Sequence, residues 1–213
     1  MADPEYNFIL QSISQDKKVP TEKLEDLMDS IAMWESDINK ESVIPNAIQI
    51  SQGANGFVDG PGRGAFQFEM VGVGSGRNKS AKNRLTNYYK KLKRERPEWL
   101  KQLPDNFDAS TLPLEQQKML FLGDARMGPG NLSKLVTDNR GGYSNGGMSV
   151  GDWWAKHHKI SGVTTEDIKD FNDRADKNRR IKREAGVLRS RRAVLIDPED
   201  PNMMGMFQGT GEF

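Results

Sequence analysis

The sequence predicts a mainly α-helical domain of the α+β type, with a small glycine-rich hairpin or loop lobe and extended termini. Apolar residues recur at helical spacing over residues 24–32 and again over 113–126, whereas glycine is dense between residues 51 and 76. The chain has 213 residues, of which 35% are apolar and 29% charged, enough for one modest core. We expect an N-terminal arm, extended or formed by a short helix, over 1–20, a folded domain over 21–160, and a basic helical segment with a flexible tail over 161–213.

The expected helices differ in character. The clearest amphipathic pattern has spacing i, i+3, i+4, i+7, i+8, and its members are Leu24, Leu27, Met28, Ile31 and Ala32. Residues 79–96 are strongly basic and should end before Pro97, while the broad apolar surface of 113–126 is typical of a central, buried helix. Ser149 is expected to cap a short helix that carries Trp153 and Trp154. Thr164 or Thr165 should begin a further helix.

The net charge of +1 hides an uneven distribution. Residues 1–42 hold ten acidic and four basic side chains, a net charge of −6. Residues 77–96 hold nine basic and one acidic (+8), and residues 174–192 nine basic and two acidic (+7). Such blocks are usually solvated faces, although two basic blocks also suit a polyanionic partner. Nucleic acid is not the expected partner, because 174–192 has no interleaved aromatic residues and no nucleic-acid motif.

Several classes of site and location are excluded or disfavoured. There is no cysteine, which excludes disulfides and thiolate metal sites. No apolar run is long enough to span a bilayer, and the acidic start of the chain lacks the pattern of a secretory signal peptide. His157 and His158 are the only histidines, and adjacent residues of a helix face different directions, so we expect no metal and no cofactor.

Glu35 is the candidate catalytic residue because of its place on the first amphipathic helix. It lies eleven positions after Leu24 and four after Ile31, so at about 100° per residue it projects from the apolar stripe. A carboxyl group in apolar surroundings is favoured in its neutral form and can donate a proton. The alternative is that the helix has already ended and Glu35 is an ordinary exposed acid.

The residues around Glu35 form two separated motifs. Ile31-Ala32-Met33-Trp34-Glu35-Ser36 is followed, after a glycine-rich stretch, by Gly62-Arg63-Gly64-Ala65-Phe66-Gln67-Phe68. Over residues 24–70 this order resembles the lysozyme-like superfamily, in which a helix ends in Glu-Ser and a later Gly-x-Gly-x-(Phe/Met)-Gln turn lines a saccharide cleft. The resemblance implies a lysozyme-like catalytic domain over 21–160 that cleaves the β-1,4 bond between N-acetylmuramic acid and N-acetylglucosamine in peptidoglycan.

The resemblance also implies how the glycan strand is held. Ser36 would orient Glu35 or an N-acetyl group, while Gln67 and the backbone of Gly64–Phe66 would contact the sugar. Glycine lets backbone approach a ligand closely, and an amide side chain offers both a donor and an acceptor. Phe66 and Phe68 have two open roles, in the cleft or in the core of a hairpin.

The reaction type depends on a second carboxylate. A hydrolase usually needs one on the far side of the bond, and Asp59 and Glu69 are the candidates. Lytic transglycosylases, by resemblance, use a single glutamate as acid and then base while the 6-hydroxyl of the substrate attacks. The absence of a second acid in a recognisable motif favours the transglycosylase.

A third motif lies further along the chain. Gly128-Pro129-Gly130-Asn131 is similar to the end of the Ala-Tyr-Asn-Ala-Gly-Pro-Gly-Asn segment of lytic transglycosylases, but Ala125 replaces the tyrosine and Arg126 the asparagine. Either Arg126 contacts the substrate in its own way, or Gly128 is only a helix C-cap.

The segment from Leu112 to Gln117 together with Trp153-Trp154 is similar to hydrolase domains of phage virion proteins. This similarity implies an enzyme carried in a virion that acts in the host cell wall or periplasm during genome entry, with termini that contact other virion proteins. The alternative is a non-catalytic virion structural or ejection protein that keeps a lysozyme-like fold.

Overall fold

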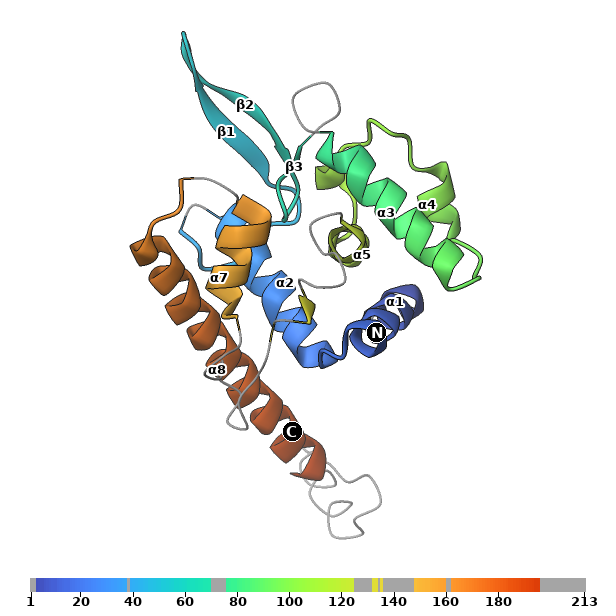
Figure 1. Ribbon diagram of the computed structural model, residues 1–213. Coiled ribbons are helices and arrows are strands. Elements are labelled where there is room, and N and C mark those ends of the chain that lie inside the picture. Colours follow the sequence, from blue (N-terminus) through green and yellow to red (C-terminus); the bar gives the residue numbers. More distant parts are fainter. Residues whose placement is uncertain are drawn as a thin grey trace, which may run out of the picture. The chain divides into compact units, whose positions relative to one another are not determined.

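The computed structural model describes residues 3–37, 39–69, 76–124, 132–133, 135, 148–159 and 162–195, and for 158, 159 and 186–195 the backbone only. The described part is mostly helical with one small three-stranded antiparallel sheet, as the composition and spacing predict (Figure 1). The chain divides into two compact units, Met1–Ala175 and Asp176–Phe213. In the described part, no helix has both the length and the apolar character needed to cross a membrane.

The N-terminal residues form a helix, one of the two forms expected over 1–20, but this helix packs into the core and is not a separate arm. Helix α1 spans Pro4–Lys17, and the side chain of Asp3 caps it by accepting a hydrogen bond from the Glu5 backbone N–H at 2.8 Å. Its apolar face is buried in the main hydrophobic cluster, through Tyr6, Ile9, Leu10 and Ile13. Local polarity suggested an arm, but these four side chains give the segment a packed face.

Helix α2, Thr21–Ser36, confirms the clearest prediction from the sequence. The five residues of the predicted stripe all have an exposed fraction of 0%: Leu24, Leu27, Met28, Ile31 and Ala32. Because the helix extends to Ser36, Glu35 belongs to its last turn, and the alternative that the helix ends earlier is wrong.

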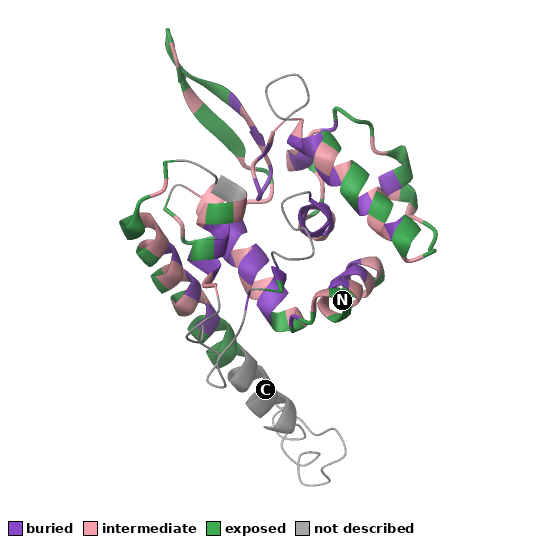
Figure 2. Ribbon diagram, in the orientation of Figure 1, coloured by how far each residue is buried: buried purple, intermediate pink, exposed green. Residues whose placement is uncertain are grey.

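The glycine-rich segment forms the sheet, in the order β1 (Ile48–Gly53), β2 (Gly56–Arg63) and β3 (Phe68–Glu69). A tight turn joins β1 to β2, with Gly53 opposite Gly56, and the φ of Gly56 is +117°, which favours glycine. Most of this hairpin is exposed, including the start of β1, and its base is buried only on the β2 side, at Gly60 and Gly62 (Figure 2). The base therefore attaches the sheet to the helices.

The middle of the chain contributes the central helix. After α3 (Arg77–Lys91), α4 (Glu98–Gln102) and the 3-10 turn η1 (Ala109–Thr111), helix α5 spans Leu114–Gly123. Every residue of α5 from Gln117 onward is buried, as the broad apolar surface predicted (Figure 2). Helix α3 ends at Lys91, earlier than the expected position before Pro97.

The C-terminal part of the first unit contains a capped short helix. Helix α7 spans Val150–Trp154, and Ser149 and Asp152 form a reciprocal capping box at its start, which confirms the predicted cap. A π-helical turn, η3, follows over Ala155–Lys159, and α8 spans Thr165–Leu195. We expected a separate segment from residue 161, but residues up to 175 belong to the first unit.

Candidate functional site

Glu35 lies in the last turn of α2 and is half-buried. The indole Nε1–H of Trp154, in α7, donates a hydrogen bond to Glu35 Oε1 at 2.7 Å. Trp154 itself is only 2% exposed, so its indole N–H needs an acceptor inside the protein. The bond fixes the orientation of the carboxyl group at the point where the two helices meet.

Aromatic rings surround this bond. The Trp34 and Trp154 rings have centroids 5.3 Å apart in an edge-on arrangement, and Phe171 of α8 stacks on Trp154 at 4.8 Å. Lys40 Nζ lies 3.4 Å from the centre of the Trp34 ring, a cation–π contact. Glu35 is thus held beside a largely apolar cluster drawn from three helices, which we call the Trp34 cluster (Trp34, Trp154 and Phe171).

The loop after α2 is folded around Asp37. Its carboxylate accepts hydrogen bonds from the backbone N–H of Asn39 at 3.0 Å and of Glu41 at 3.1 Å, and also from Ser42. These bonds hold the pKa of Asp37 below its usual value, and the bond from the Asn39 backbone contributes most to this shift. Arg174 of α8 donates to the Asn39 carbonyl at 3.2 Å. Asp37 therefore shapes the loop beside Glu35 as an ionised group.

Ser36 contacts this loop in a way that the sequence did not reveal. Its Oγ accepts a hydrogen bond from the Ile44 backbone N–H at 2.8 Å. Three residues further on, the Ala47 carbonyl accepts from the Gly64 N–H at 2.8 Å. The short segment 44–47 thus connects the end of α2 to the turn before β3, so the two motifs around Glu35 and Gln67 are tied together through the backbone.

The turn of residues 64–67 is held from α5 by Gln117, whose exposed fraction is 0%. Gln117 Oε1 accepts from the Ala65 N–H at 2.7 Å, and its Nε2 donates to the carbonyls of Pro45 and Leu112. Gly64 has a φ of +73°, and a Cβ there would overlap Gln117 Oε1. Only glycine fits this position without displacing the amide.

Gln67 has a strained backbone for a non-glycine residue, with φ +49°. Its Nε2 donates to the Gly64 carbonyl at 2.9 Å, and its own carbonyl accepts from Arg77 Nη1 at 3.1 Å. Arg77 pairs in turn with Asp124 at 3.5 Å, and both are buried. Within the described residues, Gln67 Oε1 is buried and has no hydrogen-bond partner.

Phe66 and Phe68 take the core role, one of the two that we considered. Both have an exposed fraction of 0%, and Phe66 stacks on Phe121 of α5 at a centroid distance of 4.5 Å. The expectation that the Phe66 side chain contacts substrate is therefore wrong, because a ring enclosed on all sides cannot reach a glycan.

The other candidate residues lie in different places. Asp59 is exposed on β2 opposite Ile50, and Glu69 is half-buried on β3 opposite Gly62. Arg126 lies outside the described residues, as does the Gly128–Asn131 motif.

Of the two histidines, His157 lies in η3 with its ring 5.4 Å from that of Trp153, and the side chain of the other is not described. The described residues contain no group of three or more His, Cys, Asp and Glu side chains suited to a metal ion.

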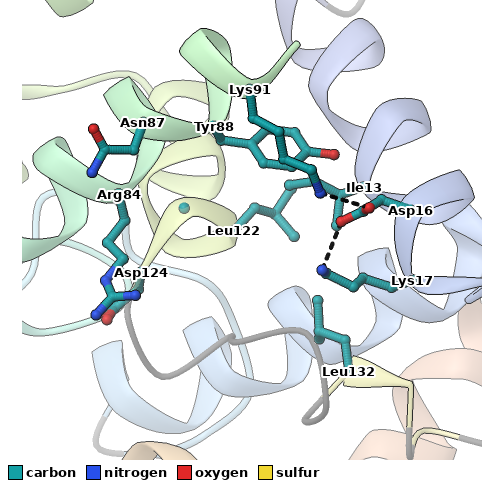
Figure 3. A pocket seen from close by; sticks show the side chains of 11 residues that line it. Ile13, Asp16, Lys17, Arg84, Asn87, Tyr88, Lys91, Leu122, Asp124 and Leu132 are labelled. Carbon is teal, nitrogen blue, oxygen red and sulfur yellow. Dashed lines mark hydrogen bonds and ion pairs between the residues drawn. The ribbon is translucent and has the colours of Figure 1, made fainter.

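A cavity of about 250 Å³ lies elsewhere, between α1, α3 and α5 (Figure 3). No residue of α2 lines it, so Glu35 is not part of it.

Comparison with known proteins gave no match. Neither the models of protein families nor the curated proteins nor the solved structures are significantly similar to this chain. The functional case therefore rests on the residues themselves.

Sequence reasoning missed the most informative contacts. The sequence placed Trp154 on a short helix, but its bond to Glu35 joins residues 119 positions apart, and no local pattern predicts such a pairing. Gln117 and Arg77 were also missed as supports of the turn. The one signal in the sequence that could have indicated the bond is the tryptophan itself, because a buried indole N–H needs an acceptor.

Proposed function

We propose that this chain cleaves the glycan strand of peptidoglycan at the β-1,4 bond between N-acetylmuramic acid and N-acetylglucosamine, with a lysozyme-like domain and Glu35 as the proton-transfer group. One observation carries the proposal: Glu35 lies in the last turn of the amphipathic helix α2, beside the Trp34 cluster, and the Trp154 indole N–H donates to its Oε1 at 2.7 Å. The motif order, from Trp34-Glu35-Ser36 to Gly64-Ala65-Phe66-Gln67, supports the same reaction.

The chemistry requires a carboxyl group that points at the glycosidic oxygen in the correct orientation. The indole bond to Oε1 orients the carboxyl plane, and the neighbouring rings limit the water that surrounds it. An acid in this setting protonates the leaving oxygen and then, as a base, removes a proton from the attacking hydroxyl or water. In the transglycosylase version of the mechanism, the attacking group is the 6-hydroxyl of the muramic acid residue.

The glycan contacts in this proposal centre on Gln67. The N–H groups of Gly64 and Ala65 already donate to Ala47 and Gln117, so they position the turn and do not bind sugar. Gln67 Oε1 is buried and has no hydrogen-bond partner among the described residues, so an N-acetyl N–H that donates to it has to enter the turn of residues 64–67. Ser36 then acts on the site through the loop that it anchors at Ile44.

We favour the transglycosylase over the hydrolase. Asp59, one of the two candidates for a second carboxylate, is exposed on β2 with Ile50 as its cross-strand neighbour. Glu69 is the better placed of the two for a hydrolase, since it is half-buried on β3, directly after the Gln67 turn. Products with 1,6-anhydro ends would support the transglycosylase, and reducing ends would support the hydrolase.

The proposed setting is a phage virion that delivers the domain to the host cell wall, with other virion proteins as partners. A non-catalytic virion protein is the second candidate, and one observation favours it. A buried indole needs an acceptor, so Glu35 has a structural reason to be present even without catalysis.

The substitution Glu35→Gln separates these two roles. Glutamine keeps an oxygen that accepts from Trp154 but cannot transfer a proton, so we expect an unchanged melting temperature and a loss of about 10²–10⁴-fold in the release of soluble fragments from purified peptidoglycan. Glu22→Gln is the matched control, since it lies exposed in the first turn of the same helix. Equal activity of Glu35→Gln and wild type would remove the catalytic role.

A further inference from the structure

The cavity between α1, α3 and α5 has an apolar floor and a polar rim (Figure 3). Ile13, Leu122 and Leu132 supply the floor, and the rim carries three cationic side chains together with Asn87 and Tyr88. At about 250 Å³ the cavity is slightly smaller than the sites of about 300–1,000 Å³ that hold drug-sized ligands. Its size therefore suits a small organic molecule rather than a chain segment.

The charges around the cavity are not balanced. Asp16 binds both Lys17, at 2.6 Å, and Lys91, at 2.8 Å, so two cations share one carboxylate. The other lining carboxylate, Asp124, pairs with Arg77. Arg84, the third lining cation, makes no hydrogen bond or ion pair with any residue that the structure describes. These groups together leave two positive charges uncompensated at the rim.

The hydroxyl group of Tyr88 provides an independent observation. This hydroxyl group is buried and has no hydrogen-bond partner among the described residues, and its residue, Tyr88, lines the cavity. Burial, and then the charge of Asp16, raises the pKa of Tyr88 to about 12, so the group stays protonated and can donate. A buried hydroxyl without a partner is costly, and a ligand acceptor would relieve that cost.

We propose that this cavity binds a small organic carboxylate with a short aliphatic body. The carboxylate pairs with Arg84, whose planar guanidinium matches its two oxygens. The aliphatic body lies on Leu122 and Leu132, and the Tyr88 hydroxyl donates to a carbonyl oxygen of the ligand. In Figure 3, Arg84 and Asn87 lie on one side of Leu122, with Asp16 and Lys17 on the other, so the ligand would span the floor. This site is separate from Glu35 and does not depend on the proposed cleavage.

The test uses the full chain and a matched pair of probes, N-acetyl-L-leucine and its neutral amide, N-acetyl-L-leucinamide. Backbone amide shifts in a ¹⁵N-labelled sample report both the affinity and the place of binding. We expect the acid to shift the amide signals of Arg84, Asn87 and Leu122, and to bind at least about tenfold more tightly than the amide. Added salt should weaken the binding of the acid only.

Single substitutions test which residues of the cavity bind the acid. We expect Arg84→Ala to lower the affinity for the acid at least about tenfold. Tyr88→Phe, which removes only the hydroxyl group, should lower this affinity a few-fold. Lys90→Ala is the control, since Lys90 is an exposed cation of the same helix that does not line the cavity. Equal binding of acid and amide, shifts confined to other parts of the chain, or an Arg84→Ala affinity equal to that of Lys90→Ala would overturn the proposal.

Discussion

At the scale of single residues, Gly64 and Gln117 determine the shape of the turn beside the candidate site. The buried Gln117 amide joins three backbone groups, those of Ala65, Pro45 and Leu112, which belong to three different parts of the chain. This geometry requires that residue 64 has no Cβ. One glycine and one glutamine therefore keep the loop after α2 and the turn before β3 together.

The substitution Gly64→Ala should destabilise the protein by about 2–4 kcal/mol. A methyl group at a φ of +73° is strained, and it would push the Gln117 amide away from the Ala65 N–H, leaving buried polar groups unpaired. Urea denaturation measures the change in the free energy of unfolding. Gly76→Ala is the control, because Gly76 has a similar φ of +61°, but no described residue lies within 4 Å of an added Cβ. Equal losses for the two variants would contradict the role given to Gln117.

Part of the candidate site could be predicted from single residues and part could not. The spacing from Leu24 and Ile31 placed Glu35 beside the apolar stripe, since helical periodicity is a local property. The indole bond from Trp154 depends on where α7 packs, which local spacing does not determine. For the same reason the sequence left both roles of Phe66 open until its burial beside Phe121 was known.

At the scale of helices, α1 is attached to its neighbours by two tyrosine hydroxyl groups. Tyr6 of α1 donates to Glu25 of α2, and Tyr89 of α3 donates to Glu5 of α1 at 2.7 Å. Lys118 of α5 joins the same network through Glu25, at 2.8 Å. These contacts explain why residues that looked like a polar arm form a packed helix.

The stability of the protein should fall in alkali because buried tyrosines, among them Tyr88 and Tyr89, have raised pKa values. Burial and then the bond to Glu5 raise the pKa of Tyr89, and burial raises that of Tyr88 to about 12, whereas an unfolded tyrosine titrates near 10. The folded chain then binds more protons than the unfolded chain above about pH 10, so its stability is complete below that value and is lost as pH rises further.

Urea midpoints measured between about pH 8 and 11 test this prediction. Tyr89→Phe should be less stable at neutral pH by about 1 kcal/mol and should show a shallower alkaline decline, because it removes one of the shifted groups. A flat stability curve in the wild type, or an equally steep decline in Tyr89→Phe, would contradict it.

Helix ends were harder to predict than helix positions. We expected the basic helix to continue to residue 96, but α3 ends at Lys91, and Lys93 has a φ of +49°. Glycine and asparagine are the usual residues at such a position, so a lysine there gives no stop signal. In contrast, Ser149 predicted the start of α7 because its side chain can accept from the helix backbone.

At the scale of the whole molecule, the first unit extends further than the sequence indicated. Phe171 stacks on Trp154, and Arg174 donates to the loop after α2, so the start of α8 completes the surroundings of Glu35. The polar, highly charged sequence after residue 161 concealed this role, because only two residues, Phe171 and Ala175, supply its buried apolar contacts in the first unit.

A chain truncated after Ala175 should have a melting temperature within a few degrees of that of the full chain. Its proposed activity on peptidoglycan should be within about twofold of that of the full chain. A chain truncated after Thr164 should lose several kcal/mol, because it loses the buried Phe171 ring and the Arg174 bond. Thermal unfolding followed by circular dichroism measures both. Equal stability of the two truncated chains would contradict the boundary at residue 175.

The central claim is that the chain breaks glycosidic bonds of the cell wall. Mass spectrometry of the soluble fragments that the purified protein releases from intact peptidoglycan tests it most directly. The account predicts fragments that carry disaccharide units with 1,6-anhydro ends, absent when Glu35→Gln replaces the wild type. Release of no fragments from walls of several chemotypes, or of fragments cut only at peptide bonds, would contradict it.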